Sequence, residues 1–108
     1  MNEEEIRKMI DDKVKNNKIM LFTKGTKDAP MCGFSAATME CFKELNAPFE
    51  TMDILANPEV RPVLQNYSNW PTTPQVFIDG KFVGGCDITR EMFASGELKK
   101  LVDKALGT

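Results

Sequence analysis

An uninterrupted apolar run at residues 19–22 limits the choice of fold more than any other segment of this chain. The run is Ile-Met-Leu-Phe, and Thr23-Lys24-Gly25 closes it. A strand with one face in water alternates apolar and polar residues, whereas a continuous run of this length is typical of a strand covered on both faces. The segment is therefore predicted to be the buried central strand of a sheet.

Apolar periodicity and end signals predict five helices around this strand. They are expected over residues 3–17, from Cys32 to Leu45, from Asn57-Pro58 to Tyr67, from a cap near Asp87, and over residues 98–106. In the third helix Asn57 is the expected capping residue and Pro58 the first-turn proline. Pro62 is still within the first turn, where its missing N–H costs little.

Three further strands are predicted over residues 49–53, 75–78 and 81–83. Asp79-Gly80 is a strong two-residue hairpin signal, so the last two strands are expected to be antiparallel. The first two strands are separated by a crossover helix and are expected to be parallel. The fold class is therefore α/β, with a small mixed four-stranded sheet covered by helices, and 108 residues leave no room for a second domain.

Composition excludes several classes of protein. Histidine is absent, which excludes Cys-His and Ser-His hydrolases and every histidine-containing metal site. A net charge of −2 gives no nucleic-acid footprint, and no apolar run approaches the roughly 18 residues of a membrane span. Three cysteines, an odd number, do not resemble a secreted disulfide framework, so a reducing intracellular compartment, cytoplasmic or mitochondrial matrix, is expected.

Cys32 is the candidate nucleophile. It stands where a helix follows a strand and a loop, and the free amides and dipole of a helix start lower a thiol pKa. The alternative, a buried inert cysteine, suits Cys41, which shares a helical stripe with Ala37 and Leu45. Dithiol oxidoreductases have a second thiol at the fourth position of this motif, where Ser35 stands here, so an outside thiol is required. Glutathione is the expected one.

Four segments of the chain resemble the signatures of the monothiol, CGFS-type glutaredoxins. They are Lys24-Gly25-Thr26, Cys32-Gly33-Phe34-Ser35, Trp70-Pro71-Thr72-Thr73-Pro74-Gln75 and Gly84-Gly85-Cys86-Asp87. The match extends over about residues 16–106. The resemblance implies one glutaredoxin domain over residues 1–108 with the thioredoxin-like fold, and a cis peptide bond between Thr73 and Pro74.

The resemblance also implies a set of glutathione-binding residues, Lys24, Arg61, Thr73, Cys86 and Asp87. Lys24 and Arg61 match the family's positions for the glycine carboxylate, and Thr73 offers backbone N–H and C=O groups to the cysteinyl part. Cys86 and Asp87, at a helix start, are expected to bind the γ-glutamyl end. Without the resemblance the two cations would be interpreted as solvated surface charges. Cys86 could instead be a second redox or ligand thiol.

A 2Fe-2S cluster needs four ligands, usually thiolates, and one exposed reactive cysteine cannot provide them. The resemblance implies a homodimer in which two Cys32 thiolates, as the metal ligands, and two glutathione thiolates bridge one cluster, with a monomer in the apo state. The expected function is an iron-sulfur cluster carrier or assembly factor with apo iron-sulfur proteins as clients. The alternative is a glutathione-dependent thiol-disulfide oxidoreductase, at most a weak enzyme, in which Cys32 attacks a glutathionylated protein. A non-catalytic adaptor is a third interpretation, without specific support.

Overall fold

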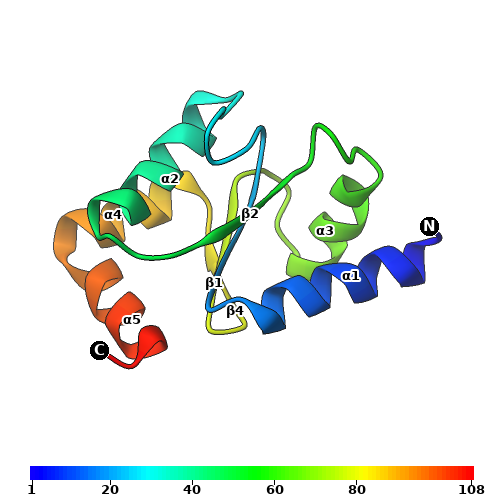
Figure 1. Cartoon of the computed structure of the whole chain (residues 1–108). Coiled ribbons are helices and arrows are strands. Elements are labelled where there is room, and N and C mark those ends of the chain that lie inside the picture. Colours follow the sequence, from blue (N-terminus) through cyan, green and yellow to red (C-terminus); the bar gives the residue numbers. More distant parts are fainter.

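A mixed sheet in the strand order β2-β1-β3-β4 organises the computed structural model, which describes residues 1–108 (Figure 1). The strands are β1 (Ile19–Thr23), β2 (Glu50–Asp53), β3 (Gln75–Ile78) and β4 (Lys81–Gly84). β1 pairs in parallel with β2 and antiparallel with β3, and β3 pairs antiparallel with β4. The predicted α/β class and both predicted strand orientations are confirmed.

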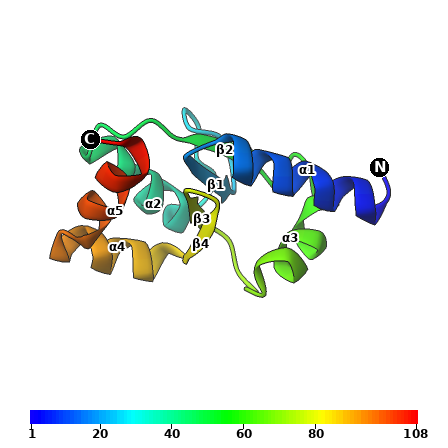
Figure 2. The ribbon, with the colours of Figure 1, turned by 90° about the horizontal axis from the view of Figure 1, so that it is seen from below.

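Five helices cover the two faces of this sheet. They are α1 (Glu3–Asn16), α2 (Gly33–Glu44), α3 (Val60–Ser68), α4 (Cys86–Ser95) and α5 (Glu97–Leu106). Helices α1 and α3 lie on one side of the strands, and α2, α4 and α5 lie on the other (Figures 1 and 2). None of these helices combines the length and the apolar character that crossing a membrane requires.

The side chains of β1 divide between two cores, one on each face. Ile19 and Leu21 belong to the core that α2 and α5 cover, whereas Met20 and Phe22 belong to the core that α1 and α3 cover. All five residues of β1 are buried, which explains the continuous apolar run in the sequence. Because a Leu→Ala change in such a core costs about 2–5 kcal/mol, this strand is a main source of stability.

The hairpin between β3 and β4 has the turn that its sequence predicts. Asp79 and Gly80 both have positive φ, 53° and 79°, as a type I′ turn requires. The Asp79 amide N–H donates to the Lys18 carbonyl at 2.7 Å, and the Lys18 ammonium lies 3.3 Å from the Asp79 carboxylate. These contacts fix the tip of the hairpin against the start of β1.

The predicted start of the third helix is wrong. α3 begins at Val60, with Glu59 in the N-cap position, and residues 57–59 form a turn before it. The Asn57 side chain is not the N-cap, and its amide donates to the main-chain carbonyl of Asp53 at 2.9 Å. This local contact, between residues four apart, links the turn before α3 back to the end of β2. Pro62 does lie in the first turn, as predicted.

The start of α4 also lies slightly earlier than predicted. Gly85 is the N-cap and Cys86 the first helical residue, so Asp87 belongs to the first turn rather than to the cap. The backbone amides of this turn are therefore available at the helix start.

Candidate functional site

Cys32 is the N-cap residue of α2. Its backbone is extended, with φ −150° and ψ 135°, and its side chain makes no capping hydrogen bond. The backbone N–H of Ser35 lowers the pKa of the Cys32 thiol most. Burial opposes this shift, and the Phe34 N–H and the Lys24 charge lower the pKa further. The predicted position of Cys32 at a helix start is confirmed, and this environment favours a thiolate.

Ser35 connects the helix that carries Cys32 to the end of β1. Its side chain is fully buried, and its Oγ accepts the backbone N–H of Lys24 at 3.0 Å. The fourth position of the motif therefore holds a hydroxyl that serves as a structural acceptor. A hydroxyl there cannot form a disulfide with Cys32.

A cleft of about 520 Å³ opens beside the start of α2. Eleven residues line it: Lys24, Phe34, Arg61, Trp70, Thr72, Thr73, Pro74, Gly85, Cys86, Asp87 and Ile88. The structure thus brings together all five residues that the family resemblance singled out for glutathione, from four separate segments of the chain. The cleft has the size of a small-molecule site, and Phe34 connects its lining to the Cys32 motif.

The loop that carries Thr73 is held from behind by Gln75. The Gln75 side chain is fully buried, and its Nε2 donates to the carbonyl oxygens of Trp70 and Thr72, both at 3.1 Å. The Thr73-Pro74 peptide bond is cis, as the resemblance implied. Gln75 therefore fixes the path of the chain immediately before β3.

Gly84 and Gly85 allow the chain to turn closely from β4 into α4. Gly84 has φ +155°, and a Cβ on it would lie 2.8 Å from the Ile88 side chain. A Cβ on Gly85 would come within 3.4 Å of the Trp70 indole nitrogen. The start of α4, with its free backbone amides, therefore faces the cleft at close range.

Trp70 has a larger part in the cleft than its sequence position suggested. It packs against Phe82, with ring centroids 5.4 Å apart, as a packing group should, but it also lines the cleft. Its Nε1 is buried and has no hydrogen-bond partner. Phe77, by contrast, is a core residue as predicted. The one available signal was the position of Trp70, next to the loop that carries Thr73.

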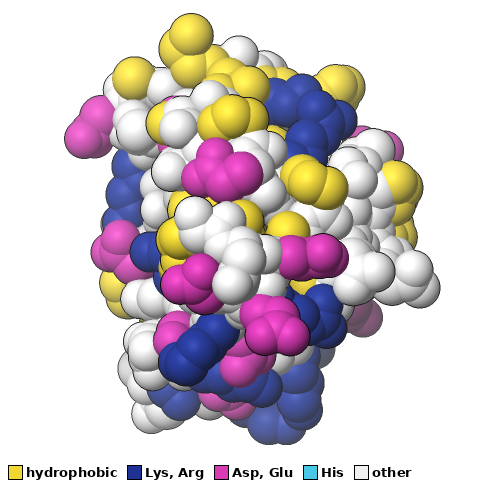
Figure 3. Space-filling view, turned by 90° about the vertical axis from the view of Figure 1, so that its right-hand side faces the viewer, with side chains coloured by type: hydrophobic (Ala, Val, Ile, Leu, Met, Phe, Trp, Pro, Cys, Tyr) yellow, Lys and Arg dark blue, Asp and Glu magenta, His cyan; other side chains and the backbone are white.

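Exposed apolar side chains gather at the end of the molecule that carries Cys32. Met31 is 70% exposed and Phe34 is 64% exposed, on either side of Cys32, and Leu55 in the loop after β2 is 51% exposed. The upper end of the molecule in Figure 3 shows hydrophobic side chains next to lysine or arginine, whereas charges of both signs cover the lower part. The surface around the cysteine is thus partly apolar.

The other two cysteines are buried, and Cys86 contributes only a small exposed area to the lining of the cleft. Cys41 is 6% exposed and Cys86 is 7% exposed, which confirms the prediction that Cys41 belongs to the core. Burial, followed by the nearby Cys86, raises the pKa of the Cys41 thiol. No group of three or more cysteine or carboxylate side chains could hold a metal ion within one chain. Cys32 is therefore the accessible thiol of the protein.

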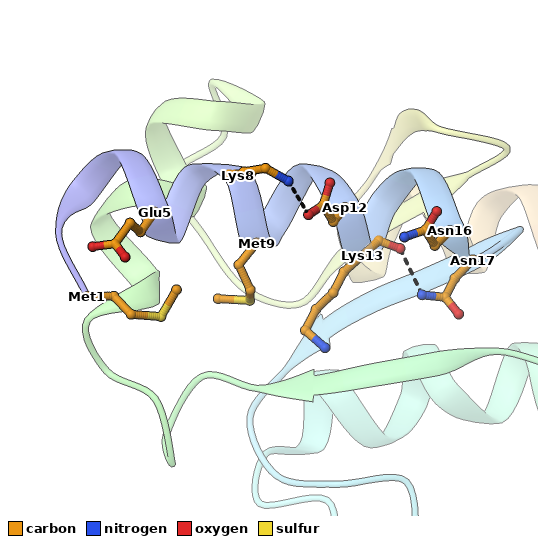
Figure 4. A pocket seen from close by; sticks show the side chains of 8 residues that line it. All are labelled: Met1, Glu5, Lys8, Met9, Asp12, Lys13, Asn16 and Asn17. Atoms are coloured by element: carbon orange, nitrogen blue, oxygen red, sulfur yellow. Dashed lines mark hydrogen bonds and ion pairs between the residues drawn. The ribbon is translucent and has the colours of Figure 1, made fainter.

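A second, more open depression of about 590 Å³ follows α1 (Figure 4). It is lined by Met1, Glu5, Lys8, Met9, Asp12, Lys13, Asn16 and Asn17. Lys8 and Asp12 satisfy each other at 2.8 Å, and no cysteine or aromatic side chain takes part. Cysteine and aromatic side chains therefore line the cleft beside Cys32 and not this depression.

Comparison with known proteins agrees with this geometry. The Glutaredoxin family profile matches residues 19–83. The chain belongs to the glutaredoxin family. Rice (Oryza sativa subsp. japonica) chloroplastic monothiol glutaredoxin-S7 is 50% identical over 94% of this chain. A monothiol glutaredoxin of Synechocystis is 47% identical over 96% of this chain and 97% of its own length. These relatives identify it as a monothiol glutaredoxin.

Solved structures agree with the fold of this glutaredoxin. The solution structure of reduced, apo poplar GrxS14 is 50% identical, covers 95% of this chain and 94% of its own, and superimposes with a TM-score of 0.84. The buckwheat glutaredoxin-glutathione complex has a TM-score of 0.85 at 24% identity, over 95% and 92% of the two chains, and shows the same fold. The chain spans 61% of the length of the rice relative.

Proposed function

We propose that this glutaredoxin binds glutathione in the cleft beside Cys32 and, as a homodimer, carries a 2Fe-2S cluster as cargo to apo iron-sulfur proteins. The observation that carries the proposal is the set of cysteine environments. One accessible thiol stands at a helix start with a lowered pKa, the other two thiols are buried, and a buried serine hydroxyl occupies the fourth position of the motif.

The cleft supports glutathione by its distribution of charge and backbone groups. Glutathione has two carboxylates and one amine on an extended backbone. Lys24 and Arg61 line the cleft together and are proposed to hold the glycine carboxylate. The Thr73 backbone is proposed to pair with the cysteinyl part, and the α4 start at Cys86 and Asp87 with the γ-glutamyl end.

The cluster is proposed to be shared between two chains because one chain has too few ligands. A 2Fe-2S cluster takes four ligands, and one chain offers the single accessible thiolate of Cys32. Two Cys32 thiolates and two glutathione thiolates complete the set, and the chain without cluster is proposed to be a monomer. Half of the ligands then belong to an exchangeable small molecule, which favours transfer of the cluster over its retention.

Glutathione-dependent disulfide reduction is the competing function, and the lowered pKa of Cys32 favours it. The Cys32 thiolate would attack a glutathionylated protein, forming a disulfide with the glutathione sulfur and releasing the protein thiolate. A second glutathione thiolate would then attack this mixed disulfide, giving oxidised glutathione and regenerating Cys32. Because Ser35 cannot resolve the intermediate, this turnover depends on a bimolecular step and is expected to be slow.

Anaerobic reconstitution tests cluster binding. The wild-type chain, loaded with iron, sulfide and glutathione, should show the visible absorbance of a 2Fe-2S cluster. Because the proposed ligands hold one cluster per dimer, about two iron ions should be found per dimer. Cys32→Ser should lose this absorbance, and the matched variant Cys86→Ser should keep it. A Cys32→Ser protein that still binds about one cluster per dimer would contradict the proposal.

Transfer and reduction assays at one glutathione concentration separate the two functions. The loaded dimer should deliver its cluster to an apo-ferredoxin faster than free iron and sulfide assemble one there. Robust glutathione-coupled disulfide reduction without detectable cluster transfer would establish the oxidoreductase instead. A reducing compartment is proposed for either function because all three cysteines are free thiols.

A further inference from the structure

The two cations proposed to hold the glycine carboxylate come from different segments. Lys24 directly follows β1, and Arg61 lies in the first turn of α3. Both line the cleft, yet neither forms an ion pair with a carboxylate of this chain. Their relative position must therefore come from the backbone that carries them.

Asp53, the last residue of β2, binds both of these backbone segments. Its Oδ1 accepts the N–H of Gly25, the residue after Lys24, at 2.9 Å. The same oxygen accepts the N–H of Leu55, also at 2.9 Å, in the loop that leads to α3. One carboxylate oxygen thus joins the loop after β1 to the loop after β2.

The connection continues from Asp53 to the start of α3. The main-chain carbonyl of Asp53 accepts the side-chain amide of Asn57 at 2.9 Å. The Asn57 and Pro58 carbonyls in turn accept the N–H groups of Val60 and Arg61, at 3.0 and 3.4 Å. The turn before α3 is therefore bonded to the main chain of Asp53, and the Asp53 carboxylate holds the same loop at Leu55.

The charge on Asp53 strengthens the two hydrogen bonds that its carboxylate accepts from Gly25 and Leu55. The Gly25 N–H, more than any other group, lowers the pKa of the Asp53 carboxyl, and the Leu55 and Ala56 amides add to it. Hydrogen bonds to an ionised acceptor are roughly twice as strong as neutral ones. On the far side, the Lys24 N–H donates to the buried Ser35, so the Lys24-Gly25 segment is held from two directions.

We propose that Asp53 is a positioning residue of the glutathione cleft, which sets Lys24 and Arg61 at the separation that one carboxylate of glutathione requires. This role rests on the proposed glutathione binding. Asp53 is not among the residues that line the cleft, and it is proposed to act through the backbone N–H groups of Gly25 and Leu55.

Glutathione titration calorimetry of the full apo chain tests the role. Asp53→Ala removes both bonds and should weaken glutathione binding about tenfold. Asp53→Asn keeps an oxygen that can accept the same N–H groups and should stay within about threefold of wild type. The control is Asp12→Ala, which removes an exposed carboxylate paired with Lys8 on α1 and should leave the affinity unchanged.

A double-mutant cycle distinguishes positioning from general destabilisation. In a chain that already carries Lys24→Ala and Arg61→Ala, Asp53→Ala should weaken binding by less than about twofold, since the cations that it positions are gone. Equal weakening in both backgrounds would overturn the proposal. If Asp53→Ala does not fold, Asp53→Glu replaces it, because it keeps the charge but moves the oxygen by one methylene, and unchanged affinity there would also overturn the proposal.

Two outcomes distinguish the positioning role of Asp53 from the proposed binding of glutathione itself. A wild-type chain that does not bind glutathione overturns the proposed function, and the role of Asp53 with it. A wild-type chain that binds glutathione, together with an Asp53→Ala chain of equal affinity, overturns the role of Asp53 alone.

Discussion

The start and the middle of helix α2 each carry a cysteine, and the two thiols have opposite chemistry. Cys32, at the N-cap, is partly accessible, and the Ser35 N–H lowers its pKa. Cys41, nine residues on, is 6% exposed in the core, and burial raises its pKa. The residue type is the same and the helix is the same. What differs is whether the sulfur faces free amides at a helix end or apolar side chains at a helix flank.

This difference shows how one helix separates chemistry from stability. At the N-terminus of α2 the backbone N–H groups have no partner within the helix and can hold an anion. In the middle every amide is already bonded, and the buried face contacts the core that includes Leu21, Met39 and Phe42. A thiolate is favoured at the first place and disfavoured at the second.

Alkylation should show the largest difference between the two thiols. In the native chain at neutral pH, iodoacetamide should modify Cys32 at least about a hundredfold faster than Cys41 or Cys86, because a buried thiol reacts only after local opening. Peptide mapping by mass spectrometry at short times measures each site separately. In denaturant the three rates should converge, and comparable native rates would contradict the assignment of Cys32 as the reactive thiol.

Glutathione affinity should depend on cations near the start of α2 and not on those near its end. Lys24→Ala or Arg61→Ala should each weaken binding about ten- to a hundredfold, because charge-assisted hydrogen bonds contribute about 1.5–3 kcal/mol. Lys43→Ala, in the last turn of α2, is the matched control and should bind as wild type does. Calorimetric titration of the folded apo variants measures these affinities, and unchanged binding in both test variants would remove the two residues from the site.

Stability should depend more on Cys41 than on Cys32, which is the reverse of their order in reactivity. Cys41→Ser places a hydroxyl in the apolar core and should lower the free energy of unfolding by about 1–3 kcal/mol. Cys32→Ser should change it by less than about 0.5 kcal/mol, or raise it slightly, because serine is a preferred N-cap residue. Urea denaturation of both variants measures this, and an equal loss in the two would show that the two cysteine positions on α2 do not differ as described.

The smallest effect should be a loss of stability at high pH through Cys41. Because the folded-state pKa of Cys41 is raised, its contribution is complete below the unfolded pKa of about 8.5 and is lost as pH rises through the folded value. The lowered pKa of Cys32 acts in the opposite sense: its contribution is present above the unfolded pKa and is lost as pH falls through the folded value. Unfolding free energies measured at about pH 7 and about pH 10 should therefore fall more in wild type than in Cys41→Ala. Equal falls would argue against an ionisation cost at this position.

Much of the fold follows from local sequence because the strongest signals are local. The apolar run of β1, the Asp79-Gly80 turn and the crossover between β1 and β2 each correspond to an element of the structure with its predicted orientation. The start of α3 does not, because residues 57–59 form a turn whose Asn57 amide donates to the Asp53 carbonyl, and the helix begins only at Val60.

Local sequence predicts the position of Cys32 at a helix start, the hydroxyl at position 35 and the burial of Cys41, because helical periodicity and strand ends are properties of neighbouring residues. The three-dimensional arrangement is needed to see that Trp70 lines the cleft and that the Asp53 carboxylate accepts the N–H groups of both Gly25 and Leu55. These contacts join the loops after β1 and β2, and strand pairing alone brings those loops to the same edge of the sheet. A short-range sequence pattern contains no information on the distance between these two loops, since strand pairing depends on residues that are far apart along the chain.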